Sequence, residues 1–168
     1  MNTALAAKGN CFIEDYTTDL STTPSKGRFC TLSAATATQL AINPLQAWYP
    51  VVVTSATTKS GLFLIADTGT HPKPSGGGSD YKNSLCPLGA ALPPMFVLIS
   101  AQQGSPIPVG SSLVLASDGG VIADPGSGAR VVVGTLLDEN TTNATGANGA
   151  NAGDLVAVQL MAPVYYAS

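Results

Sequence analysis

Hydrophobic residues occur along this chain in short runs, which are separated by many of its 18 Gly and 12 Pro residues. The runs are rich in Val, Leu, Ile and Phe, and most are longer than a turn but shorter than a helix. This pattern predicts strands at residues 28–32, 49–55, 61–66, 95–101, 112–116, 120–123, 130–137 and 154–161. The sequence therefore predicts an all-β fold.

Two of the predicted strands are apolar at successive positions rather than at alternate ones. These are residues 49–53 and residues 131–133. Both faces of such strands must be covered, so we expect them near the centre of a sheet. The predicted body is a β-barrel or a sandwich-like arrangement.

Two strand pairs are predicted from the turns that join them. Asp118-Gly119 stands between the apolar runs 112–116 and 120–123, and such a dipeptide supplies the positive φ angles that a tight hairpin requires. A polar connection over residues 56–60 suggests that residues 49–55 and 61–66 form a second pair.

Long stretches without an apolar strand pattern interrupt this scheme. Residues 67–94 and 138–153 exceed the usual connection of about 4 to 6 residues, so both are predicted as irregular loops. The second contains no large apolar side chain as an anchor, and we expect it to project. Residues 1–26 are predicted to form an extended N-terminal arm, and residues 27–168 the β domain.

The two halves of the predicted β domain resemble each other in sequence. Residues 27–33 resemble residues 110–116, and Gly61-Leu-Phe-Leu-Ile parallels Gly153-Asp-Leu-Val-Ala-Val. One interpretation is a duplication into related units at residues 27–101 and 109–161. The other is the ordinary likeness between any two sets of β-hairpins.

Composition narrows the kinds of surface that this chain can form. Charged residues make up 10% of it, against about 25% in an ordinary soluble domain. The exterior must therefore consist largely of Ser, Thr, Ala, Gly, Asn and Pro, which another protein can cover without desolvating many charges. This favours either an assembly component or a plain β domain with a weakly charged coat.

Charge and hydropathy argue against nucleic acid and against a membrane as partners of this chain. The net charge is −3 and the seven Lys and Arg residues are scattered, which argues against a surface for nucleic acid. No stretch approaches the ~18 to 20 apolar residues that a membrane helix needs. Residues 1–10 lack the pattern of a secretion signal, so synthesis and residence in a cytoplasm are the default expectation.

Reactive side chains are few and far apart, so no enzyme activity, metal or cofactor is predicted. Cys11, Cys30 and Cys86 are odd in number and widely spaced, as expected for buried or incidental thiols. His71 is the only histidine and stands in a predicted loop. Most carboxylates fall in predicted turns, where Asp usually bonds its own backbone. The segment Asp138-Glu139-Asn140 is the best case for a cation, but further ligands at fixed offsets are missing.

A resemblance to a known family rests on residues 109–161. Their order is a Gly110-x-x-Leu-Val-Leu strand, the Asp118-Gly119 hairpin, a Val-rich strand that continues into Val133-Gly134, an Ala/Asn/Gly-rich loop and a closing strand from Gly153-Asp154. This order resembles the small capsid decoration, or cement, proteins of tailed bacteriophages. It covers about a third of the chain, and residues 140–153 are longer and richer in Asn than the family requires.

The resemblance implies a β-barrel or β-tulip-like body and a structural, non-enzymatic protein of the virion. It would assemble in the host cytoplasm, bind the outer surface of the capsid and bridge neighbouring major capsid protein subunits. It would also associate with itself as a homotrimer, with a dimer as the alternative.

Aromatic residues near chain ends and strand ends are the candidates for protein interfaces, since aromatic side chains carry much of the energy of such contacts. For the residues of the predicted arm, the alternative to an interface role is a disordered tail. For Trp48 and Tyr49, the alternative is a place in the protein core. The candidates are Phe12, Ile13, Tyr16, Trp48, Tyr49, Tyr165 and Tyr166.

Two other functions remain open from the sequence. One is a bacterial surface or pilus-type adhesion module, which shares the Thr/Asn-rich β composition but requires export. The other is a small trimeric β-barrel enzyme with its active site between subunits, against which the scarcity of His and charged residues speaks.

Overall fold

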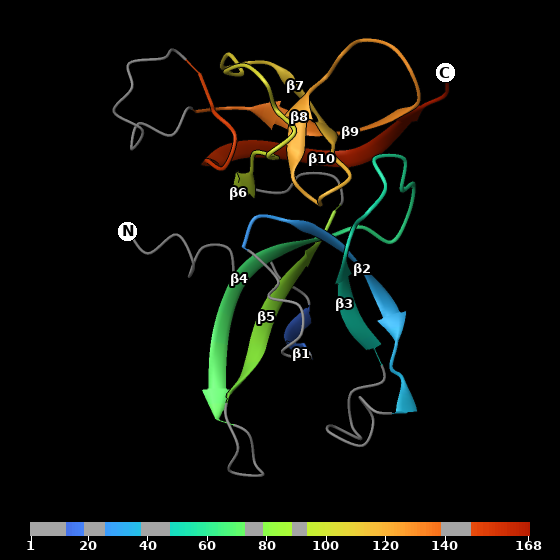
Figure 1. The fold of residues 1–168 in the computed structure, drawn as a ribbon, viewed down its shortest axis with the longest axis vertical. Coiled ribbons are helices and arrows are strands. Elements are labelled where there is room, and N and C mark those ends of the chain that lie inside the picture. The colour runs from blue at the N-terminus through green and yellow to red at the C-terminus, as the bar shows by residue number, and fades with distance from the viewer. Residues whose placement is uncertain (1–12, 19–25, 38–47, 73–78, 89–93, 139–148) are drawn as a thin grey trace.

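The computed structural model describes residues 13–18, 26–37, 48–72, 79–88, 94–138 and 149–168. For residues 13–18, 67–72 and 79–84 only the backbone is described. Within these ranges, ten strands form two five-stranded antiparallel sheets, one above the other in Figure 1. The fold is all-β, as the sequence predicts.

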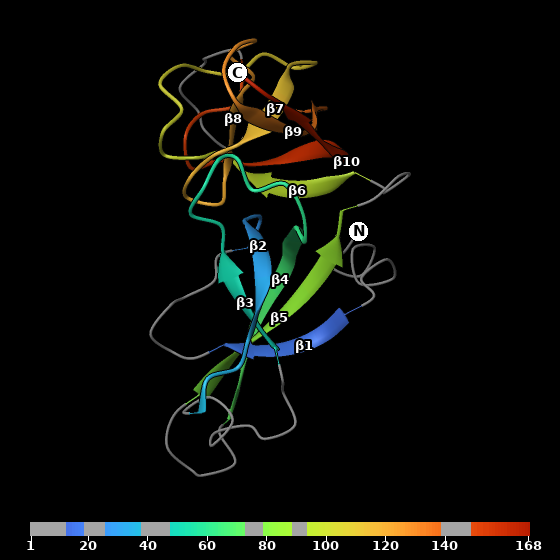
Figure 2. The same ribbon diagram turned by 90° about the vertical axis from the view of Figure 1, so that its right-hand side faces the viewer.

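The first sheet is built from the N-terminal half of the chain in the order β1-β5-β4-β2-β3. It curls, as Figures 1 and 2 show, so that its edge strands β1 and β3 approach each other. Its strands are β1 (Ile13–Thr18), β2 (Phe29–Ala34), β3 (Trp48–Val52), β4 (Phe63–Pro72) and β5 (Ser79–Pro87).

The second sheet follows from the C-terminal half in the order β6-β10-β9-β7-β8. A parallel bridge between Ile99 and Val121 joins the end of β6 to β8, so this sheet curls back on itself. Its strands are β6 (Met95–Leu98), β7 (Ser112–Leu115), β8 (Val121–Ala123), β9 (Arg130–Leu136) and β10 (Leu155–Tyr166).

All eight predicted strands overlap strands of the structure, and the predicted hairpin forms from β7 and β8. Asp118 and Gly119 occupy its turn. Gly119 has a φ of +78°, and the Asp118 carboxylate accepts a 3.0 Å hydrogen bond from the Gly120 N–H. The sequence signal for this turn thus corresponds to the backbone angle and to the side-chain bond that the turn requires.

The prediction of an irregular loop at residues 67–94 was wrong over most of its length. β4 continues to Pro72, and β5 pairs with it in a long hairpin that includes His71 opposite Asp80. The sequence of these strand halves is rich in Thr, Ser, Asn and Gly. Backbone pairing does not need apolar side chains, so a search for apolar runs misses such strands.

Within the predicted N-terminal arm, β1 pairs with β5 at the edge of the first sheet. Residues 1–12 and 19–25 lie outside the described residues, as do residues 139–148 of the loop predicted at residues 138–153. The far end of that loop is held to the body, since Ala150 is buried and forms a bridge with Ile107.

The first sheet also corrects two predictions about strand neighbours. β3 and β4 do not pair with each other, because β2 lies between them and pairs with both. β3 is therefore an edge strand rather than a central one, and Val51 is exposed. In contrast, β9 lies between β10 and β7, and Val131, Val132 and Val133 are all buried, as predicted.

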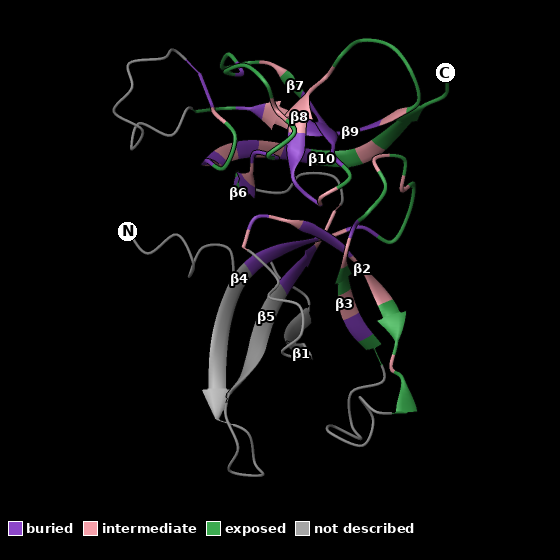
Figure 3. Ribbon diagram, in the orientation of Figure 1, coloured by how far each residue is buried: buried purple, intermediate pink, exposed green. Residues whose placement is uncertain are grey.

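One hydrophobic core joins the two sheets. It contains residues from β2, β4 and β5 of the first sheet together with the inward-facing residues of the second, and Figure 3 shows buried residues on both sides of the junction. A smaller cluster of Cys30, Ile65 and Leu85 packs on the opposite face of the first sheet. The two sheets are therefore packed against each other.

Glycines allow the backbones to meet at this junction. The Phe29 N–H donates to the Gly119 carbonyl at 2.6 Å, and the Leu98 N–H donates to the Gly27 carbonyl at 2.9 Å. A Cβ on Gly119 would lie 2.6 Å from the Val52 Cγ1, and one on Gly27 would lie 2.7 Å from the Leu98 nitrogen. Neither position has room for a side chain.

Candidate functional site

The structure separates the interface residues predicted from the sequence into three groups. Phe12 lies outside the described residues, and only the backbone of Ile13 and Tyr16 is described, in β1. Tyr49 is 4% exposed and belongs to the interior, whereas Trp48 is 50% exposed at the start of β3. Tyr165 and Tyr166 are 38% and 45% exposed at the end of β10.

The second half of β10 exposes several large apolar side chains. Burial changes along the strand: its first half alternates buried and half-buried residues, and its second half is mostly exposed, as Figure 3 shows. The exposed large residues here are Met161, Val164, Tyr165 and Tyr166. We call residues 161–166 the C-terminal edge.

A bulge gives the C-terminal edge its shape. Leu160 is opposite Gly134 of β9, and Val164 is opposite Val132, so three residues of β10 stand against the single residue Val133. Pro163 lies within this bulge, where a strand can accept a residue without an N–H. Beyond the bulge, Val164, Tyr165 and Tyr166 pair with β9 again.

The two tyrosines lie on opposite faces of β10, and each contacts a cation. Tyr165 is opposite Val131, a core residue, and the Lys59 Nζ lies 3.8 Å from the centroid of its ring. Lys59 belongs to the β3–β4 connection, so this contact also links the two sheets. Cation–π contacts at such exposed sites are worth about 0.5 to 1 kcal/mol.

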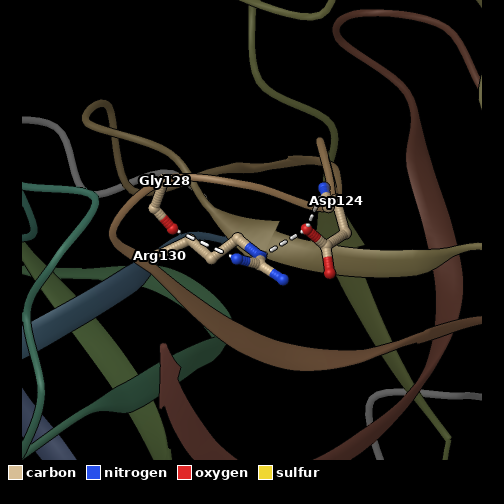
Figure 4. A network of polar contacts seen from close by, with 4 residues as sticks. Asp124, Gly128 and Arg130 are labelled. Carbon is tan, nitrogen blue, oxygen red and sulfur yellow. Dashed lines mark hydrogen bonds and ion pairs between the residues drawn. The ribbon is translucent and has the colours of Figure 1, made fainter. Parts of the chain in front are cut away.

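Tyr166 contacts Arg130, which is fixed by a polar network (Figure 4). The Arg130 guanidinium carbon lies 4.4 Å from the centroid of the Tyr166 ring. Arg130 Nε forms an ion pair with Asp124 Oδ1 at 2.6 Å, and Nη1 donates to the Gly128 carbonyl at 3.1 Å. The guanidinium is thereby held in place under the ring, and its charge is balanced by a carboxylate.

Sequence reasoning selected the two tyrosines but missed Lys59 and Arg130. Arg130 is recognisable only when β9 is known to run antiparallel beside β10, which places it opposite Tyr166. Lys59 is more than a hundred positions away in the sequence from Tyr165, and no local signal connects them.

Each carboxylate with described side-chain bonds accepts a hydrogen bond from the backbone of a turn, as the sequence predicts for Asp in such positions. Asp118 accepts from Gly120, Asp124 accepts from Gly126 at 2.8 Å, and the buried Asp154 accepts from Asn151 at 2.9 Å. Within the described ranges, no group of three or more His, Cys, Asp or Glu residues is placed to hold a metal ion.

Two of the three cysteines, Cys30 and Cys86, are buried. Cys30 packs in the small cluster and Cys86 in the main core. Burial raises the pKa of the Cys30 thiol to about 12, because the thiolate would be deprived of solvent there. At neutral pH this side chain is a protonated core residue rather than a nucleophile.

Comparison with models of protein families, with curated proteins and with solved structures gives no match. In the described part of the chain, no helix has the length and apolar character needed to span a membrane.

Proposed function

We propose that the chain is a structural capsid cement protein, which binds the outer surface of a tailed-phage head and bridges neighbouring major capsid protein subunits. The observation that carries this proposal is the C-terminal edge, where four large apolar side chains are exposed in a chain with 10% charged residues. Aromatic residues already held in one orientation lose little side-chain entropy when a partner covers them.

The architecture of the second sheet also supports the proposal. The segment that resembles decoration proteins, residues 109–161, forms the β7–β8 hairpin, β9 and most of β10, and all four belong to this sheet. The sequence order on which the resemblance rests thus coincides with a set of neighbouring strands.

A cement protein acts through the area of its contacts and needs no catalytic residues. Binding of the same surface at many equivalent positions on a capsid turns modest individual contacts into high total affinity. In this proposal Tyr165, Tyr166 and Val164 contact the capsid or a neighbouring copy, and Lys59 and Arg130 orient the tyrosines.

Co-sedimentation with empty heads of the phage that encodes the chain tests the proposal. We expect saturable binding at a fixed stoichiometry, and we expect Tyr165→Ala with Tyr166→Ala to weaken it at least about tenfold. The matched control is Val109→Ala, which truncates a residue that is 53% exposed and lies outside the C-terminal edge. Failure of the native protein to sediment with heads would refute the proposal and favour the adhesion module.

A further inference from the structure

The two sheets have the same topology. The strand order is β1-β5-β4-β2-β3 in the first sheet and β6-β10-β9-β7-β8 in the second. When the strands of each sheet are counted from one to five along the chain, both orders read 1-5-4-2-3, and all neighbours are antiparallel in both sheets. The first strand also approaches the third in both, through contacts between β1 and β3 and through the bridge from the end of β6 to β8.

Hairpins alone do not produce this order. Consecutive strands are the common neighbours in sheets, but two of the four pairings here, first with fifth and fourth with second, join strands that are not consecutive. The same two pairings occur in both halves of the chain. We call residues 13–87, with β1 to β5, the first unit and residues 95–166, with β6 to β10, the second unit. Sequence likeness alone suggested units at residues 27–101 and 109–161.

One of the sequence likenesses agrees with this topology. Residues 27–33 resemble residues 110–116, which sets β2 beside β7, and these are the second strands of the two units. Gly27 and Gly110 precede the two strands at the same distance, and their φ angles are +83° and +87°. The other likeness sets β4 beside β10, which are not equivalent strands.

Strand pairing extends the alignment of β2 with β7 across each sheet. In both units a residue of the second strand pairs with the fourth strand. Two positions further along, the fourth strand pairs with a residue of the fifth strand that also pairs with the first. The residues on this path are Cys30, Phe63, Ile65 and Leu85 in the first unit, and Leu113, Gly134, Leu136 and Val158 in the second.

The inner face of each curled sheet is apolar at the same positions. In the first unit, Cys30, Ile65 and Leu85 form the small buried cluster. The equivalent residues of the second unit are all fully buried in the main core: Leu113, Leu136 and Val158. Each unit therefore has an interior of its own, built from equivalent positions.

The outer face differs between the units. The outer residues next to the path in the first unit are buried and apolar and belong to the main core with the interior of the second unit: Phe29, Leu64 and Cys86. The equivalent residues of the second unit are polar, and none is buried: Ser112, Thr135 and Gln159. A polar outer face at the end of an array prevents a further repeat from packing there.

We infer that the chain is a tandem repeat of one five-stranded unit, in which the outer face of the first unit is the docking surface for the second unit. The partner of this surface is thus a unit of the same kind, supplied by the same chain. Because each unit has its own inner cluster, each keeps its sheet when docking is lost. The inference concerns the junction within the chain and does not depend on binding to a capsid.

Two double variants of the full chain separate docking from folding. The outer-face variant, Leu64→Thr with Cys86→Gln, introduces the residue types that stand at the equivalent positions of the second unit. The matched inner-face variant, Ile65→Thr with Leu85→Gln, makes the same kinds of change at the adjacent residues of the same strands. All four parent residues are fully buried, so burial alone predicts equal damage.

We expect the two variants to differ in the first unit. The outer-face variant should retain the native far-ultraviolet circular dichroism and the native fluorescence of Trp48, the only tryptophan, which lies in β3. The inner-face variant should lose the native Trp48 fluorescence without denaturant, because it disrupts the interior of the first unit.

Cleavage of the folded chain measures docking itself. A protease site inserted between Leu88 and Pro94 separates the two units after folding. The fragments of the otherwise unsubstituted chain should elute together in gel filtration, at the mass of the whole chain by light scattering, because the shared core holds them. The fragments of the outer-face variant should elute separately.

Three results would overturn the inference. They are equal loss of structure in the two variants, separation of the fragments of the unsubstituted chain, and fragments that stay together in the outer-face variant. Because no capsid is present, none of these results bears on co-sedimentation with heads.

Discussion

At the scale of single residues, the buried thiol of Cys30 makes stability depend on alkaline pH. Its pKa is raised by burial to about 12 in the folded protein, from an ordinary value of 9.0. Above pH 9 the unfolded chain loses a proton that the folded chain retains, so stability falls as the pH rises from 9 towards 12. We expect the free energy of unfolding to fall more steeply than in Cys30→Ala, by up to about 1.4 kcal/mol per pH unit.

Urea denaturation of both proteins at a series of alkaline pH values measures this difference. Truncation to Ala adds a constant loss of packing, and other groups titrate in both proteins, so the difference in slope isolates the thiol. Parallel curves for the two proteins would show that Cys30 does not titrate differently in the folded state.

Adjacent residues also show what the sequence could predict at this scale. Trp48 and Tyr49 both precede Pro50 and both were candidates for core or interface, yet Tyr49 is buried and Trp48 is half exposed. Successive residues of a strand point to opposite faces, so only one of the two can face the interior. Which one does so depends on how β3 sits against β2, and that register is not encoded in the local pattern.

At the scale of elements, the β7–β8 hairpin depends on Asp118 for more than its own turn. Its carboxylate accepts bonds from the Gly120 N–H, from the buried Ser100 Oγ at 2.9 Å and from the Ala101 N–H at 3.3 Å. We expect Asp118→Ala to lower the free energy of unfolding by about 3 kcal/mol, because these donors lose a charged acceptor. Thermal and urea denaturation measure the loss.

Asp138→Ala is the control for this hairpin prediction, since it removes a carboxylate from an exposed position. It should change the stability by less than about 0.5 kcal/mol. Similar effects of the two substitutions would mean that the bonds of Asp118 contribute little.

The elements that the sequence predicted share a feature that the missed ones lack. All eight predicted strands contain apolar runs, and the hairpin turn has a specific signal in Asp118-Gly119. β5 and the far half of β4 are rich in polar residues, and pairing with neighbours rather than hydrophobic pattern defines them. The position of β2 between β3 and β4 is likewise a matter of topology, which short-range patterns do not specify.

At the scale of the whole molecule, the main question is whether the two sheets unfold together. The shared core and the hydrogen bond from Phe29 to Gly119 both join them. The composition indicated a chain able to associate with other proteins. Nothing in the sequence indicated that the tip of the β7–β8 hairpin would pack against β2 and β3. Contacts of this kind between distant segments depend on the complete fold.

Gly119→Ala tests this joint unfolding, because it alters the second sheet where it meets the first. The added Cβ would lie 2.9 Å from the Phe29 carbonyl oxygen, in addition to its clash with Val52, and a φ of +78° is unfavourable for Ala. We expect a loss of about 2 to 4 kcal/mol. Trp48, the only tryptophan, reports on the first sheet through its fluorescence, and circular dichroism reports on both. If the sheets form one cooperative unit, both signals shift together.

Gly126→Ala, with a φ of +74° and nothing within 4 Å, measures the cost of the backbone angle alone, about 1 kcal/mol. A fluorescence transition that stays in place while the circular dichroism shifts would show that the first sheet unfolds independently of the second.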